Sequence, residues 1–337
     1  MLLKESPEDF KVFEIIDQSI FVDEPTRVHI YTLKKTNYTT ERAVSHIAKA
    51  LHIPRKFISY AGTKDKNAVT EQLISIKGST KEAVEKLVLK DIKLKFEGYS
   101  KHLLSLGELI GNRFEITIRN LTKFPEVIPE EFIVPNYFDE QRFSTNNVDI
   151  GLCLVKKDFK GAVDLISKDD DDFRDGIKTH LEKHKNDFVG AFRLVPKRIS
   201  LFYIHALQSK LFNDLLANLI SEGISWKYSQ GIFKFFKEPV LTKPIDKLPL
   251  IGYLSKLSES EMTVLKQFDI IPRNFLITSL PELCLEGSDR KAFLDVKNCK
   301  EVERNNDSIT ISFELGKGSY ATIVIKQLFA MNNIFDN

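Results

Sequence analysis

Hydrophobic and polar residues alternate along much of the first 120 residues, with helical spacing in between. Val12, Glu14 and Ile16 face one side of a strand-like run. A helix is expected over 37–51, where Thr39 is a candidate cap. Several expected strands have one polar face, which favours an antiparallel or mixed α+β sheet over a buried parallel one. Further strands are expected over 28–34, 57–60, 71–77, 92–96 and 114–118, a capped helix over 80–90, and a polar loop over 107–112.

The pattern changes after Asn120. Prolines punctuate the chain up to Pro135, and helical periodicity then dominates over 147–167 and 200–223. Strand character returns at 308–313. Strands, a helix-rich block and strands again predict an insertion, so the C-terminal strands should rejoin the sheet begun by the N-terminal part.

Composition adds a domain count and excludes some functions. At 337 residues the chain exceeds the usual size of one core, which favours two domains. Hydrophobic residues make up 42% and charged residues 28%, as in a soluble globular protein. The net charge of +2 does not predict nucleic-acid binding, so an anionic partner would bind a local basic patch. No window has the length and apolarity of a signal peptide or membrane span, and a cytoplasmic location is expected.

Several common cofactor sites are disfavoured. The three cysteines lie far apart without C-x-x-C spacing, which argues against disulfides and thiolate metal sites. His180 and His184 are four residues apart, but their charged surroundings favour a solvated helix face over a zinc site. The chain contains neither G-x-x-x-x-G-K-[ST] nor G-x-G-x-x-G, so hydrolysis of nucleoside triphosphates and dinucleotide chemistry are weak hypotheses.

The stretch AGTKDKNAVTEQ (Ala61–Gln72) offers the clearest candidate chemistry. It forms a glycine turn between two strand-like runs and presents Asp65 between Lys64 and Lys66. The neighbouring ammonium groups favour an ionised carboxylate, which suits a nucleophile or base better than an acid. Glycine, aspartate and asparagine are also ordinary turn residues, so this loop alone does not establish catalysis.

Four further side chains stand near glycine or proline turns beside strands: Phe10, Asn112, Phe114 and Tyr320. Aromatic rings can stack on a nucleobase and an amide can bind its edge. Burial in the core is the ordinary alternative for a phenylalanine such as Phe10.

Taken together, the motifs resemble the TruD family of tRNA pseudouridine synthases. Six of them match in order across nearly the whole chain: SPEDFKVFE (6–14), AGTKDKNAVTEQ (61–72), GNRFEITIR (111–119), PNYFDEQRFS (135–144), HALQSKLFN (205–213) and GSYAT (318–322). The resemblance implies a V-shaped protein with two domains. Residues 1–132 and 288–337 would form the catalytic domain with the pseudouridine-synthase sheet, and 133–287 the helix-rich insertion domain. Asp139 departs from the usual NYFG motif.

The resemblance also implies roles for individual residues. Asp65 would be the catalytic aspartate and Lys4 its partner, with Lys64 and Lys66 as competitors for that pairing. Phe10 and Tyr320 would contact the target base, while Asn112 and Phe114 would shape the site. The candidate contacts to the RNA backbone are Lys64, Lys66, Arg142, Lys197 and Arg198, the last three because they lie in or beside the matching motifs.

The implied reaction converts uridine to pseudouridine in tRNA, at position 13 by resemblance, with no metal or other cofactor. Other RNAs are further candidate substrates, and neither a membrane nor an obligate protein partner is implied. Attack of Asp65 on the sugar and removal of the 2′ proton both remain open. The alternative is a catalytically silent protein that binds or folds RNA with the same cleft, which would need the aromatic and basic residues but not the acid.

Overall fold

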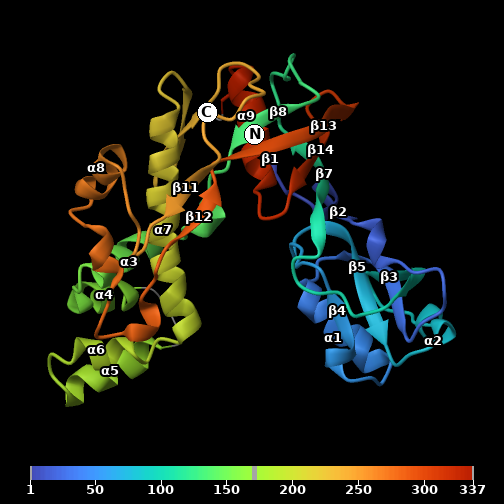
Figure 1. Cartoon of the computed structure of the whole chain (residues 1–337), viewed down its shortest axis with the longest axis horizontal. Helices are drawn as coiled ribbons and strands as arrows, with labels where there is room; N and C mark the ends of the chain where they lie inside the picture. Colours follow the sequence, from blue (N-terminus) through green and yellow to red (C-terminus); the bar gives the residue numbers. More distant parts are fainter. Residues whose placement is uncertain (1, 169–172, 336–337) are drawn as a thin grey trace. The chain divides into compact units, whose positions relative to one another are not determined.

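The computed structural model describes residues 2–168 and 173–335, which form two compact units. The first unit contains the chain up to Phe132 together with Asp295–Ala321. The second contains Ile133–Leu294 and Thr322–Phe335. Figure 1 labels their helices and strands. The V-shaped arrangement expected from the sequence remains a prediction.

The first unit is built on one mixed sheet, as the strand patterns predicted. Its strands follow the order β6-β3-β5-β2-β7-β14-β13, and the path continues to β8. Strands β2 and β5 pair in parallel, whereas β2 with β7 and β3 with β5 are antiparallel. The strands are β1 (Leu2–Leu3), β2 (Phe10–Ile16), β3 (Val28–Thr36), β4 (Ile58–Tyr60), β5 (Val69–Lys77), β6 (Ile92–Ser100), β7 (Leu109–Arg119), β8 (Phe132–Pro135), β13 (Phe293–Arg304) and β14 (Ile309–Gly316).

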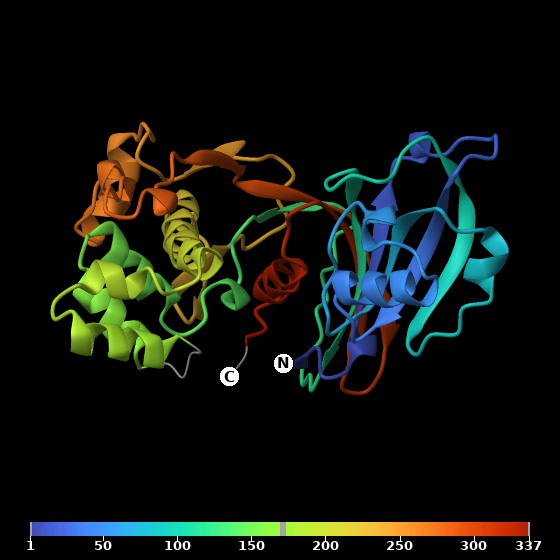
Figure 2. The ribbon, with the colours of Figure 1, turned by 90° about the horizontal axis from the view of Figure 1, so that it is seen from below.

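Helix α1 (Thr40–Ala50) lies across this sheet (Figure 2). Its apolar residues, including Val44 and Ile47, join Tyr31, Leu33 and Ile74 in a buried core. The Thr39 hydroxyl caps its first turn by accepting from the Arg42 amide. This cluster fixes the strands that flank the Asp65 loop.

Helix α2 (Lys81–Glu85) is shorter than the predicted helix over 80–90. The chain turns back after it, because Leu89 forms a β-bridge with Ile92 and Asp91 adopts a left-handed conformation with φ of 58°. Local pairing to the next strand therefore replaces the last turns of the expected helix.

The C-terminal strands rejoin the sheet as predicted, since β14 pairs antiparallel with β7 from Ile309 to Gly316. The expected loop over 107–112 is wrong over its last four residues, because β7 already begins at Leu109. Gly111 permits this early start: a Cβ atom there would lie 2.3 Å from the Leu315 carbonyl oxygen. Asn112 consequently lies within the sheet and not in a loop.

The second unit is mainly helical, as the periodicity predicted. The helical run over 147–167 is divided in two, because Lys157 adopts a left-handed φ of 63° and Asp158 caps a new helix. The long central helix α7 begins and ends earlier than the predicted 200–223. The helices are α3 (Asn147–Val155), α4 (Phe159–Ile166), α5 (Arg174–Lys183), α6 (Phe188–Phe192), α7 (Lys197–Leu219), α8 (Glu259–Gln267) and α9 (Ala321–Met331). Two antiparallel pairs accompany them: β9 (Ile224–Tyr228) with β10 (Gly231–Phe235), and β11 (Lys247–Leu250) with β12 (Ser288–Lys291).

Residues 288–294 and 322–335 also belong to the second compact unit. The division into a catalytic domain and an insertion domain over 133–287 remains a prediction. Asp139 explains the attachment of α9. Its buried carboxylate accepts hydrogen bonds from Thr322 and from Lys326, the latter at 2.6 Å. The aspartate that departs from the NYFG pattern therefore fastens α9 within its own unit.

Candidate active site

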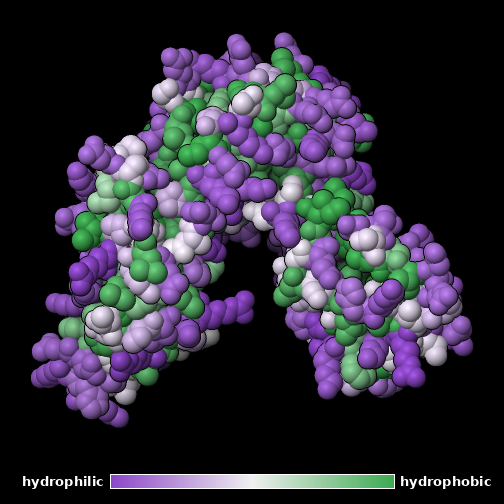
Figure 3. Space-filling view, in the orientation of Figure 1, coloured by the Kyte–Doolittle hydropathy of each residue, from purple (hydrophilic) through white to green (hydrophobic). Residues whose placement is uncertain are grey.

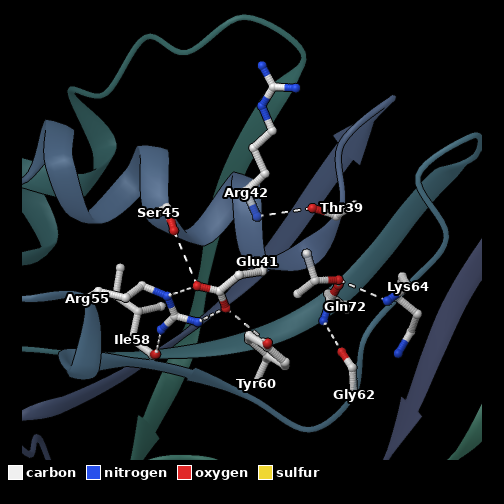
Figure 4. Close-up of polar contacts among 11 residues, drawn as sticks. Thr39, Glu41, Arg42, Ser45, Arg55, Ile58, Tyr60, Gly62, Lys64 and Gln72 are labelled. Carbon is white, nitrogen blue, oxygen red and sulfur yellow. Dashed lines mark hydrogen bonds and ion pairs between the residues drawn. The ribbon is translucent and has the colours of Figure 1, made fainter. Parts of the chain in front are cut away.

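The Asp65 loop connects β4 to β5 and is held by hydrogen bonds from outside the loop (Figure 4). The Gln72 amide nitrogen donates to the Gly62 carbonyl at 2.8 Å. The Thr40 hydroxyl donates to Gln72 Oε1 at 2.8 Å and accepts from the Lys64 amide at 2.9 Å. Because Gln72 and Thr40 are themselves buried, the backbone that leads into Asp65 has a fixed position.

Lys35 of β3 holds the Asp65 loop through a hydrogen bond to its main chain. This lysine was not identified from the sequence. Its side chain is fully buried at the end of β3. The ammonium Nζ donates to the carbonyl of Asp65 at 2.9 Å and to that of Tyr38 at 2.6 Å. Burial lowers the pKa of Lys35 to about 8, although the nearby Asp65 charge opposes this effect. Lys35 thus fixes the main chain of the residue predicted to be catalytic.

Lys64 forms a buried ion pair with Glu14, whose side chain is 1% exposed. Glu14 also accepts a hydrogen bond from the Leu73 amide at 3.1 Å. Burial raises the pKa of Glu14, while the Lys64 ammonium opposes the rise. The Lys64 side chain is itself only 5% exposed, so little of it faces solvent, and its contact to the RNA backbone remains a prediction. Its role is to anchor the loop.

Asp65 pairs with Lys4, not with either neighbouring lysine. Lys4 Nζ donates to Asp65 Oδ2 at 3.1 Å, and the carboxylate side chain is 49% exposed. Oδ1 accepts no hydrogen bond from any residue that the structure describes. One carboxylate oxygen is therefore oriented by an ammonium group, and the other remains available for chemistry. Lys66 is exposed in the same loop.

Aromatic residues form the wall beside this pair. Lys4 Nζ lies 3.8 Å from the ring centroid of Phe10. Phe10 contacts Phe114 edge to face at 6.1 Å, and Phe114 stacks on Phe313 at 5.6 Å. Phe10 is only 3% exposed, so it occupies a core position and also contacts Lys4, the partner of Asp65. Its ring supports Lys4 and does not offer an open face.

Asn112 lies on β7 two residues before Phe114, paired in register with Glu14 of β2. Its side-chain oxygen is buried and has no hydrogen-bond partner among the described residues. Buried amide oxygens are normally satisfied, so this one is an acceptor suited to a ligand N–H group. Tyr320 follows β14 after Gly318, whose φ of 80° favours glycine.

Comparison with known proteins shows which family this chain is similar to. The family model of tRNA pseudouridine synthase D (TruD) matches residues 1–178, 172–238 and 243–328. The chain belongs to the tRNA pseudouridine synthase D family. The tRNA pseudouridine synthase D of Aquifex aeolicus is 32% identical, with 97% of each chain covered. A probable tRNA pseudouridine synthase D 2 of Methanocaldococcus jannaschii is 33% identical, covering 98% of this chain and 92% of the relative.

The fold of this family member matches a solved structure as well. A crystal structure assigned to tRNA pseudouridine synthase D of Methanosarcina mazei superposes with a TM-score of 0.74 at 28% identity. The match covers 99% of this chain and 93% of that one. The α+β architecture is therefore that of the tRNA pseudouridine synthase D family.

The remaining candidate residues of this family member lie in the second unit. Lys197 and Arg198 are exposed in the first turn of α7. The Arg142 side chain donates from Nε to the Ser209 hydroxyl at 3.2 Å and lies near the rings of Phe138 and Phe202. All three remain candidates for contacts to RNA.

His180 lies in the last turn of α5, and His184 is its C-terminal cap. His180 Nε2 lies 2.9 Å from Asp187 Oδ2, and hydrophilic residues are prominent around α5 on the face shown in Figure 3. Within residues 2–168 and 173–335, no three histidine, cysteine or acidic side chains gather as metal ligands would. Nor is any helix in this described part both long and apolar enough to span a bilayer.

Proposed function

We propose that this chain isomerises uridine to pseudouridine in tRNA, at position 13 by resemblance, with Asp65 as the catalytic carboxylate. The main support is the Asp65–Lys4 pair, which occurs in a rigidly held loop within a match to the tRNA pseudouridine synthase D family along the chain. A protein that only binds RNA would need no carboxylate oriented in this way.

The reaction rearranges bonds within one nucleotide. The C1′–N1 bond breaks, the uracil turns while it stays bound, and C5 bonds to the same C1′. The hydrogen on C5 leaves as a proton and N1 gains one, so the reaction needs no oxidant and no group donor. An ionised Asp65 serves either as the nucleophile at C1′ or as the base for the 2′ proton. Lys4 orients the carboxylate for both.

The surrounding residues hold the base. To reach an acid in a loop, the uridine must leave its stack, which costs a few kcal/mol. Stacking on Tyr320 offsets part of this cost. The Asn112 side-chain oxygen is assigned to the uracil N3–H, because it is a buried acceptor without a protein partner. Phe10 and Phe114 form the apolar wall that contacts the base edge.

The direct test uses tRNA labelled with tritium at uracil C5. Isomerisation must release the label into water. We expect the tritium of one uridine to be released per tRNA molecule. Binding of tRNA without any release would show that the protein is catalytically silent.

Tyr320→Ala is expected to lower turnover by an amount equivalent to about 1 to 3 kcal/mol, the value of one stacked base. Tyr320→Phe keeps the ring and should retain most of the activity. Rates of tritium release at saturating tRNA measure both variants, and thermal unfolding checks their stability. Equal loss of activity in both variants would show that stacking is not the role of Tyr320.

Replacing Lys197 and Arg198 together by glutamine should weaken tRNA binding and flatten its dependence on salt. Each lost phosphate contact lowers the slope of log affinity against log salt by about one. The matched control replaces Lys183 and Lys185, two exposed lysines of the same unit outside the matching motifs. Affinity is measured across a salt series. If both double variants retain the wild-type slope, Lys197 and Arg198 do not contact the RNA backbone.

A further inference from the structure

Two of the sequence motifs meet at a pocket within the second unit, and the proposed chemistry leaves this pocket without a role. The pocket has a volume of about 410 Å³. Phe138 and Arg142 come from the PNYFDEQRFS motif, and His205 and Ser209 come from the HALQSKLFN motif on α7. Arg290 of β12 completes its polar lining.

The pocket has a positive wall. The guanidinium of Arg290 lies 4.1 Å from the ring centroid of Phe138, and that of Arg142 lies 5.7 Å from the same centroid. A terminal nitrogen of Arg290 donates to the Asn136 side-chain oxygen at 2.6 Å, which holds the guanidinium in place. An anion in the pocket would be attracted by the positive charges of both arginines that line it. Glu286 is the acidic residue of the lining, but it is exposed and accepts a hydrogen bond from Tyr253 at 3.4 Å.

Arg142 is arranged to donate to such an anion. Its Nε donates to the Ser209 hydroxyl, which in turn donates to the His205 carbonyl at 2.7 Å. The two terminal nitrogens of Arg142 donate to none of the residues that the structure describes. A guanidinium oriented through Nε in this way presents a fork that fits the two oxygens of a phosphate.

The rest of the lining suits a nucleoside. His205 is half-buried, and neither of its ring nitrogens bonds to a residue in the described ranges. Burial, together with the Arg142 charge, lowers the pKa of His205, which favours a neutral ring with one donor and one acceptor. Leu250 and Leu285 add apolar surface. A site for phosphate alone would need neither the apolar part nor this volume, which lies in the range of small-molecule sites.

We propose that this pocket binds one nucleotide of the substrate RNA other than the target uridine, with its phosphate at Arg142 and Arg290 and its base beside His205. This assignment rests on the proposed function for the identity of the RNA. It gives the second unit a specific recognition site in addition to general backbone contacts. An acidic peptide is the competing ligand, because arginine also binds carboxylates.

Photocrosslinking tests the proposal on the full-length protein. A photoreactive p-benzoylphenylalanine replaces Phe202, which is 39% exposed and whose ring lies 5.1 Å from the Arg142 guanidinium. The control position is Leu219, 42% exposed at the far end of the same helix, roughly 26 Å away along its axis. The crosslinked nucleotide in tRNA is then mapped by reverse transcription.

One dominant crosslinked nucleotide is expected from position 202, and not from position 219. Adding Arg142→Gln should lower the yield about ten-fold, the usual effect of losing a charge-assisted hydrogen bond. Arg193→Gln is the matched control, since that exposed arginine donates to the Ser279 carbonyl outside the pocket. Crosslinks spread evenly over the tRNA, or equal effects of the two substitutions, would overturn the proposal.

Competitors separate the ligand classes. Uridine 5′-monophosphate should suppress the crosslink at concentrations where inorganic phosphate does not. Equal suppression by phosphate would overturn the nucleoside part, and suppression only by a glutamate-rich peptide would assign the pocket to a protein partner. The crosslink does not depend on catalysis. A mapped crosslink without tritium release would contradict the proposed isomerase activity alone. Tritium release with no effect of Arg142→Gln on the crosslink would contradict the proposed nucleotide pocket alone.

Discussion

Asp65→Asn should lower turnover by about 10⁴-fold or more, the scale seen when an essential catalytic side chain is removed. The substitution preserves shape but removes the negative charge that either step requires. Affinity for tRNA should change little, because Asp65 repels phosphate and is not expected to bind it. Single-turnover tritium release and equilibrium binding measure the two effects separately.

Glu71→Gln provides the matched control. Glu71 is also a carboxylate of the first unit that accepts a hydrogen bond from a lysine, at 2.8 Å from Lys34. Its substitution should leave turnover unchanged. Turnover of Asp65→Asn near the wild-type rate, in protein with normal thermal unfolding, would contradict the assignment of Asp65.

Lys35→Met should lower kcat by about 100-fold, the effect of roughly 1 Å of misplacement in a catalytic group. The variant leaves the carbonyls of Asp65 and Tyr38 without their buried donor. KM should change less, since Lys35 is fully buried and does not contact RNA. Lys34→Met is the control. Lys34 is the sequence neighbour of Lys35, but its side chain is half-exposed and pairs with Glu71 at the surface. Equal kcat in the two variants would show that Lys35 does not position Asp65.

The pH dependence of stability gives Lys35 a second test. Its folded pKa of about 8 lies below the ordinary value of 10.5. Between these values the unfolded chain binds more protons than the folded one at this residue, so stability gains a contribution as pH rises. The free energy of unfolding of the wild type, relative to Lys35→Met, should therefore increase from pH 8 to 10.5. A constant or falling difference would mean that burial does not disfavour the charged lysine.

The sequence predicted the strands and the loop that carries Asp65 well, because these features depend on local patterns. The two-residue periodicity of the strands also placed Lys35 and Glu14, the two residues that hold the Asp65 loop, at inward positions. Lys35 follows Tyr31 and Leu33 on the inward side of β3, and Glu14 lies between Val12 and Ile16. A charged residue at an inward position indicates a buried partner. The identity of that partner depended on tertiary contacts that the pattern does not contain.

Long-range contacts also explain two features that the sequence did not reveal. The attachment of α9 to the second unit follows from Lys326 meeting Asp139, residues that lie far apart along the chain. Lys64 seemed available for phosphate because it neighbours Asp65, yet Glu14 on another strand holds it in the interior. Sequence neighbours in a tight loop point in different directions, so proximity along the chain did not decide the partner of Asp65.

We propose that this protein turns over tRNA uridine through Asp65. Tritium release from C5-labelled tRNA tests it most directly, because pseudouridine has the same mass as uridine and binding alone releases no label. The account predicts release by the wild-type protein up to one equivalent per tRNA, and none above background by Asp65→Asn. Tight tRNA binding by the wild-type protein without any release would contradict it.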